Sequence, residues 1–276
     1  MTQVPPAAAS RRRRRGLTLM ELVVVMTVLA ALAAILIPLL PNLLRRAHKV
    51  TDATQSQELA KSVQLYQALY ISYPEEWDLM TDGTTTTAPA FVPADDDSPF
   101  GGGAYIGTLN AEEVAALRRV GIERVHAFGD GTAADFHPTK NPYAAAVTAP
   151  TTLTADTTEV FVIDGTGSTL GALPVEIQNT ILRDPTARFV LFGCGSRCTA
   201  VGKVIQNAPT SVPQNKEFTP STLYARTGVI FQVAGVGIDN TTERARFIGA
   251  VALEDDELES TETDLIGYYD VANSGE

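Results

Sequence analysis

Residues 11–44 read RRRRRGLTLMELVVVMTVLAALAAILIPLLPNLL, and this stretch decides the architecture of the chain. From residue 17 to residue 44 the side chains are almost all aliphatic, and Glu21 is the only ionisable one among them. A helix rises about 1.5 Å per residue, so these residues would span roughly 42 Å, more than the roughly 30 Å hydrocarbon layer of a bilayer. The stretch is therefore predicted to form a membrane-spanning helix with a turn or more to spare.

The charges on either side of the span predict its orientation. Residues 11–15 are five consecutive arginines directly before the span, and such basic blocks remain on the cytoplasmic side of a membrane. Arg45, Arg46 and Lys49 follow the span, but they are fewer, and their long side chains can reach lipid headgroups. We therefore expect the N-terminus in the cytoplasm and the body of the protein on the far side of the membrane.

Three interpretations of this segment compete. A permanent anchor explains the apolar length but gives no reason for Glu21. A cleaved secretory signal would need a small-x-small site, and Ala31-Leu32-Ala33 fits only at the cost of an apolar new N-terminus. Ser10 and the arginines after it also suggest a twin-arginine export signal, for which an apolar run of this length is untypical. The third interpretation accounts for the acidic residue as well.

The sequence from Gly16 to Glu21, GLTLME, preceded by basic residues and followed by an aliphatic helix, closely resembles the leader of type IV pilins and type II secretion pseudopilins. The resemblance implies that a prepilin peptidase cuts between Gly16 and Leu17 and that the new amine of Leu17 is methylated. Family members usually begin with Phe, so Leu17 is a mild departure. Loss of the five arginines would change the formal charge from −11 to −16.

A carboxylate inside a bilayer costs a few kcal/mol by insertion scales, so Glu21 needs a partner or a function. In isolation the side chain could simply reach the interface. The family resemblance implies instead that Glu21 pairs with the N-terminal amine of a neighbouring subunit during assembly on an inner-membrane platform. Pro38 and Pro41 would end an ordinary helix or kink it, and the resemblance favours a helix that bends there and continues.

Beyond the span, the pattern predicts an α+β fold: a long N-terminal helix, half transmembrane and half amphipathic, packed on a C-terminal head with a mainly antiparallel sheet. Apolar residues three and four apart indicate that the helix continues, and the Tyr73-Pro74 pair resembles the place where this helix ends in pseudopilins. We expect a leader at residues 1–16, an assembly helix at 17–44, its amphipathic continuation at 45–81, a head at 82–254 and an acidic segment at 255–276.

Within the head, turn residues and apolar runs predict the individual elements. Residues 82–103 are expected to form a long loop, and residues 255–264 a solvated acidic stretch. A helix at residues 111–119 should be capped by Asn110 and stopped by Gly121, and a second helix is expected around residues 175–182. Strands are expected at residues 122–128, 159–163, 188–192, 228–234 and 246–253.

Composition excludes several classes of function. A formal charge of −11 with a pI near 4.8 disfavours nucleic-acid binding through a broad basic face.

Two cysteines cannot build a disulfide scaffold, but Cys194 and Cys198 could close a small loop in an oxidising compartment, and we leave that pairing open. Asp95, Asp96 and Asp97 are candidate calcium ligands without the spacing of a dedicated loop, so a solvated cluster is the preferred interpretation.

No motif of catalysis stands out. The glycine-rich run at residues 165–171 follows a predicted strand, but its spacing is not that of a phosphate-binding loop, and a turn is expected. The three histidines are scattered. We therefore expect a non-enzymatic subunit without a cofactor, first a pseudopilin of a type II secretion system with its head in the periplasm before it enters a filament. The alternatives are a minor type IV pilin in adhesion, motility or DNA uptake, and a membrane-anchored binding or hydrolytic domain.

Overall fold

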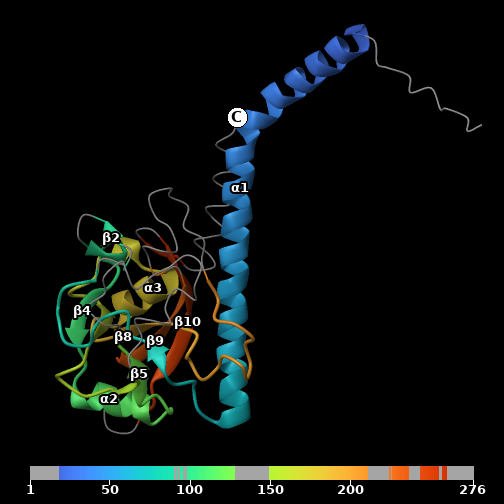
Figure 1. Ribbon diagram of the computed structural model, residues 1–276. Helices are drawn as coiled ribbons and strands as arrows, with labels where there is room; N and C mark the ends of the chain where they lie inside the picture. Colours follow the sequence, from blue (N-terminus) through green and yellow to red (C-terminus); the bar gives the residue numbers. More distant parts are fainter. Residues whose placement is uncertain are drawn as a thin grey trace, which may run out of the picture. The chain divides into compact units, whose positions relative to one another are not determined.

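The computed structural model describes residues 19–89, 92, 94–95, 98–127, 149–210, 224, 226–235, 243–254 and 257–259. The chain divides into two compact units, Met1–Leu44 and Arg45–Glu276. Helix α1 (Leu19–Tyr70) is continuous in its backbone from the first unit into the second (Figure 1). Its first part, Leu19–Ile37, is long and apolar enough to cross a membrane, and none of it is buried inside the protein.

Helix α1 runs through Pro38 and Pro41 without a break, so these prolines do not end it. It ends at Tyr70, where Ile71 adopts a left-handed backbone conformation (φ 59°) and donates its N–H to the carbonyl of Gln67 at 2.9 Å. A left-handed residue directly after the last helical one is a common helix-terminating cap, and here it satisfies the carbonyl of Gln67. The helix therefore ends just before the Tyr73-Pro74 pair at which an end was expected, but the range 45–81 given for the helical continuation is too long, because its last part contains strand β1 (Trp77–Asp78).

The second half of α1 is amphipathic, as its pattern predicted. Ala53, Leu59, Val63 and Tyr66 are buried at helical spacing, whereas the intervening positions such as Glu58 are exposed. A stripe of this kind removes apolar surface from water only where another element covers it. Here the covering element is a β-sheet within the same unit.

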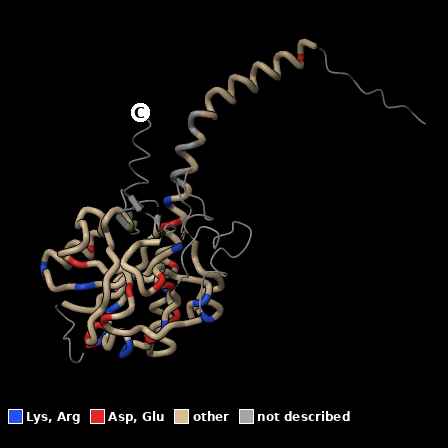
Figure 2. Tube along the Cα trace, turned by 60° about the vertical axis from the view of Figure 1, so that its left-hand side comes forward, with Lys and Arg blue, Asp and Glu red and all other residues tan. Residues whose placement is uncertain are grey.

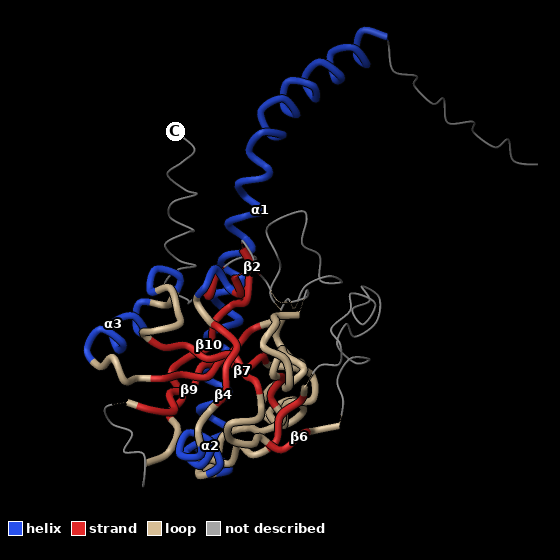
Figure 3. The backbone as a smooth tube through the Cα atoms, turned by 90° about the vertical axis from the view of Figure 1, so that its left-hand side faces the viewer, coloured by secondary structure: helices blue, strands red, loops and turns tan. Residues whose placement is uncertain are grey.

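The main sheet contains nine strands in the described part of the chain, and Figure 3 shows them gathered into one layer. Its order is β11-β10-β9-β8-β1-β5-β6, with β7 also pairing with β8 and β4 pairing with β7. Among the described strands every pair is antiparallel except β1 with β5. The remaining strands of this sheet are β4 (Tyr105–Thr108), β5 (Arg124–His126), β6 (Thr151–Thr152), β7 (Glu159–Asp164), β8 (Arg188–Gly193), β9 (Thr227–Ala234), β10 (Arg246–Glu254) and β11 (Glu257–Glu259).

Two hydrophobic cores lie on the two faces of this sheet because side chains alternate along each strand. On β8, Val190 and Phe192 join the core that contains Leu59 and Val63 of α1. Phe189 and Leu191 join the other core, which contains residues of helix α3 (Val175–Arg183). Helix α2 (Ala111–Arg118) packs into the first core, so the head has helices on both faces of its sheet.

The α+β class and most of the expected elements of the head are confirmed, with two corrections. The segment at residues 82–103 is not one long loop, because it contains the hairpin of β2 (Ala94–Asp95) with β3 (Ser98–Pro99) and the short helix η1 (Phe100–Gly102). The acidic stretch from residue 255 is not wholly solvated. Strand β11 within it pairs with β10, and Leu258 is buried in the core.

Candidate functional site

The N-terminal part of α1 combines an exposed apolar surface with a single acid. Glu21 lies in the first turn of the helix, where the positive end of the helix dipole favours a negative charge. The apolar side chains after it are about half exposed or more, among them Leu22, Val23, Val24 and Val25. Figure 2 shows this stretch almost entirely in the colour of uncharged residues, whereas the head carries both signs of charge.

Such an arrangement is unfavourable for an isolated chain in water. Exposed apolar patches of this extent mark a contact with protein or membrane. In a lipid layer the aliphatic side chains would be satisfied, whereas a carboxylate such as that of Glu21 is tolerated there only when it is paired or reaches the interface. Gly16 and Leu17, between which cleavage is predicted, lie outside the described residues.

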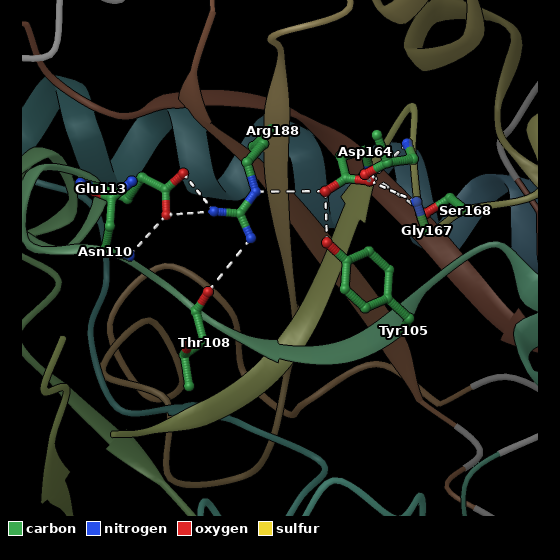
Figure 4. Close-up of polar contacts among 9 residues, drawn as sticks. Tyr105, Thr108, Asn110, Glu113, Asp164, Gly167, Ser168 and Arg188 are labelled. Atoms are coloured by element: carbon green, nitrogen blue, oxygen red, sulfur yellow. Dashed lines mark hydrogen bonds and ion pairs between the residues drawn. The ribbon is translucent and has the colours of Figure 1, made fainter. Parts of the chain in front are cut away.

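A second polar centre lies in the head, where four elements meet around Arg188 (Figure 4). Its guanidinium donates to both carboxylate oxygens of Glu113, at 2.7 and 2.8 Å, and to the carbonyl of Thr108 at 3.3 Å. Glu113 is buried and also accepts the N–H of Asn110 at 2.9 Å, so it closes the capping box of α2. A buried charge is tolerated only when it is paired in this way.

Asp164 at the end of β7 extends the same network. Its carboxylate accepts the hydroxyl of Tyr105 and the N–H of Gly167, and it lies 3.5 Å from Nε of Arg188. Burial alone would raise the pKa of Asp164, but the hydrogen bonds from Tyr105, Gly167 and Thr166 outweigh it and lower the pKa. Burial and the bond to Asp164 raise the pKa of Tyr105.

The glycine-rich run at residues 165–171 begins with the expected turn, at residues 165–167, and ends in the short helix η3 (Leu170–Ala172); the network explains one of its glycines. The ring of Tyr105 occupies the place where a Cβ on Gly167 would stand. The carboxylates of Glu113 and Asp164 and the guanidinium of Arg188 have partners on several elements. The network therefore cross-links α2, β4, β7 and β8. We find in it a structural role for these residues.

A third centre surrounds Asp78, which is fully buried in β1 between Gly193 of β8 and His126 of β5. The hydroxyl of Tyr224 donates to its carboxylate at 2.7 Å. Burial raises the pKa of Asp78 to about 6, against the lowering effects of Tyr224 and of Arg226 nearby. Sequence analysis did not identify this centre, because a two-residue strand and a lone tyrosine give no pattern.

Cys194 and Cys198 both lie beside this third centre and are buried free thiols. Burial, followed by a hydrogen bond with Cys194, raises the pKa of Cys198 well above its usual value.

The structure does not test the calcium candidates. Asp95 is placed in β2 by its backbone alone, and Asp96 and Asp97 lie outside the described residues. Among the residues that the structure describes, no group of three acidic, histidine or cysteine side chains is placed to hold a metal.

Comparison with known proteins bears on the N-terminal segment. The prokaryotic N-terminal methylation motif matches residues 11–37. This motif is the prepilin-type leader of type IV pilins and pseudopilins, so the resemblance seen in residues 16–21 is confirmed. Searches of the curated proteins and of the solved structures gave no match.

Proposed function

We propose that this chain is a pilin-like structural subunit and, within that class, a pseudopilin of a type II secretion system. The observation that carries the proposal is the prepilin-type motif at residues 11–37, with Glu21 in the first turn of α1 and none of the apolar stretch Leu19–Ile37 buried inside the protein. A helix of this kind has a use only where lipid or other helices cover it.

The first step of its life cycle is processing. A prepilin peptidase cuts between Gly16 and Leu17 on the cytoplasmic side of the inner membrane, and the amine of Leu17 is methylated. Removal of the arginine block frees the N-terminus of the helix from the charges that hold it at the cytoplasmic face. Until assembly the head remains in the periplasm, anchored by Leu19–Ile37 as a single span.

Assembly then depends on Glu21. In a bundle of apolar helices water is scarce, and an unpaired carboxylate there is strongly unfavourable, whereas a carboxylate paired with an amine is tolerated. The Leu17 amine of a neighbouring subunit supplies that partner. Because only one axial register joins the two charges, the pair selects the position of each incoming subunit on the inner-membrane assembly platform.

The choice of a secretion pseudopilin over a pilus subunit has narrower support. Helix α1 ends at Tyr70, shortly before Tyr73-Pro74, which is where the sequence resembles the end of the long helix in pseudopilins. Deletion of the gene tests this choice. Loss of extracellular enzyme secretion with retained surface pili supports the pseudopilin, and loss of pili with retained secretion would reassign the chain to the minor type IV pilins.

The class itself is tested with Glu21→Ala in cells that assemble the protein. The expected result is normal removal of residues 1–16 but no incorporation into filaments, measured by mass spectrometry and by the sheared filament fraction. Thr27→Ala is the matched control, because Thr27 also lies in the apolar part of α1 and its hydroxyl bonds only within the helix, to Val24 at 2.8 Å. If Glu21→Ala assembles as well as this control, the charge pair is not the assembly determinant.

A further inference from the structure

The two cysteines of the chain occupy one short turn in the head. Cys194 directly follows β8, and its N–H donates to the carbonyl of Thr227 at 2.9 Å. The chain then turns back so that the N–H of Cys198 reaches the carbonyl of Gly195 at 3.2 Å. The two thiols are buried in this one turn, and the neighbouring Cys194 contributes to raising the pKa of Cys198. They are therefore neighbours in space as well as in sequence.

The turn is held from beneath by the centre around Asp78. The carboxylate of Asp78 occupies the place where a Cβ on Gly195 would stand, and the hydroxyl of Tyr224 occupies the corresponding place at Gly193. Only glycine fits at these two positions without moving a buried polar group. The backbone on both sides of Cys194 is thus packed closely against this centre.

The residues that follow the turn attach it to α1. Oγ1 of Thr199 accepts the N–H of Glu75 at 2.9 Å and lies 3.5 Å from the hydroxyl of Tyr66. Nζ of Lys203 donates to the Tyr66 hydroxyl at 3.3 Å and lies over the rings of Tyr66 and Tyr70, 5.4 and 5.1 Å from their centroids. A cation over two aromatic rings is attracted by both. The segment directly after the cysteine turn therefore adds polar contacts with the end of α1 to the packing of Tyr66 in the core.

We propose that Cys194 and Cys198 are joined by a disulfide in the mature protein, and that this bond stiffens the turn that holds the end of α1. That the head lies outside the cytoplasm, in an oxidising compartment, rests on the proposed function. The position of the two thiols in one turn is independent of that function.

The reaction needs a disulfide-bearing oxidant, such as an oxidised thiol-disulfide exchange protein or oxidised glutathione. The sulfur of one cysteine attacks the oxidant, whose S–S bond breaks as a mixed disulfide forms and a first oxidant thiol leaves. The sulfur of the other cysteine then attacks the first, so that the Cys194–Cys198 bond forms and the oxidant leaves as its second thiol. The cysteines lose two electrons, the oxidant gains them, and the two thiol protons end on the reduced oxidant.

Burial of the two thiols determines when they are oxidised. The thiolate is the attacking species, and burial together with the neighbouring thiol raises the pKa of Cys198 well above its ordinary value, so the folded pair attacks slowly. Oxidation is expected while the turn is open, during folding or on local opening. Once formed, the bond is shielded from reductants by the same burial, which is the behaviour of a structural disulfide and not of a catalytic one.

The test uses the purified full-length protein in detergent, so its outcome does not depend on export or assembly. The reduced protein is refolded in buffers of increasing oxidised-to-reduced glutathione ratio, acid-quenched, denatured and labelled with a maleimide polymer. The expected result is loss of both reactive thiols together and a peptide 2 Da lighter that contains residues 194 and 198. Two labelled thiols across the whole range, or glutathione mixed disulfides without a ring, would overturn the proposal.

Two serine variants complete the design. Cys194→Ser and Cys198→Ser each leave one thiol, which should stay labelled or form a mixed disulfide. Reduction should lower the urea midpoint of the oxidised wild type and leave that of both variants unchanged. A wild-type midpoint that does not respond to reduction would contradict the stiffening role. If the variants do not fold, the thiol count of the wild type still decides whether the bond forms.

Discussion

Replacing Arg188 with Met should destabilise the head more than the loss of any exposed ion pair. Arg188 is about one-quarter exposed, but its partner Glu113 is almost wholly buried, with 2% of its side chain accessible. The variant would leave that carboxylate, together with the nearby carboxylate of Asp164, without the cation that lies between them. Met was chosen because it fills a similar volume without a charge.

The magnitude follows from this burial. Breaking a buried ion pair by removing one partner costs about 3–5 kcal/mol, because the remaining charge is uncompensated. The partial exposure of Arg188 places the expected loss near the lower end, at about 3 kcal/mol. For a unit of this size that corresponds to a fall in melting temperature of roughly 6–12 °C. Adding Glu113→Gln to the variant should restore about half of the loss, because the isolated charge is removed while the amide still accepts from Asn110.

The assay is equilibrium urea unfolding of the full-length protein in detergent, followed by fluorescence. Trp77 is the only tryptophan of the sequence and is fully buried in β1, so its emission reports unfolding of the head. Arg124→Met is the matched control: its side chain is 46% exposed and pairs with Glu75 at 2.6 Å, and its loss should destabilise the head much less than the loss of Arg188, because solvent screens an exposed pair. Equal losses for the two arginine variants, or no recovery in the double variant, would refute the reasoning.

Three further predictions concern single residues of the head. The pKa of Asp78 is about 6 in the folded protein and near 3.8 in the unfolded chain, so the folded state binds the proton more tightly. This group therefore contributes about 3 kcal/mol of stability below pH 4, and the contribution is lost as the pH rises through 6. Asp78→Asn should remove this part of the pH dependence in urea titrations. Asn110→Ala should cost about 1 kcal/mol of unfolding free energy while Asn110→Asp stays near wild type, because Asn110 caps α2. Gly167→Ala should cost about 1–3 kcal/mol by thermal unfolding, because the new methyl group meets the Tyr105 ring, and the same substitution should cost less when it is made in a Tyr105→Leu variant.

Local signals in the sequence predicted much of the fold correctly. Asn110 followed three residues later by Glu113 is a capping-box pattern, and α2 begins directly after it. Gly121 stops that helix with a positive φ of 92°, a conformation that glycine adopts without strain. The runs of Val, Ile and Phe around residues 160, 190 and 230 are buried central strands, which lie within one or two residues of their expected limits.

Contacts between distant residues could not be predicted in this way. The cap at Asn110 was expected, but not the partner of Glu113, because Arg188 lies in another strand far along the chain. The end of α1 was expected near Tyr73-Pro74, and the helix does end close by at Tyr70, but the left-handed Ile71 that ends it has no signal in the sequence. Strand β11 was missed because its one buried apolar residue, Leu258, is surrounded by acids.

The candidate site was predictable where its chemistry is local. The motif at residues 11–37 needs only neighbouring residues: a basic block, Gly16, Glu21 and an aliphatic helix. The thiol pair is also adjacent in sequence, but its setting over Asp78 depends on three strands that meet only in the folded head. Sequence alone therefore suggested the pairing of Cys194 with Cys198 without its structural support.

The identity of the mature N-terminus tests the central claim most directly. The protein is isolated from cells that contain a prepilin peptidase and from otherwise identical cells that lack it, and its N-terminal peptide is determined by mass spectrometry. The account predicts a chain that begins with methylated Leu17 in the first case and retains Gly16 in the second. A chain that keeps residues 1–16 in both cells, or that begins beyond Ala33, would contradict it.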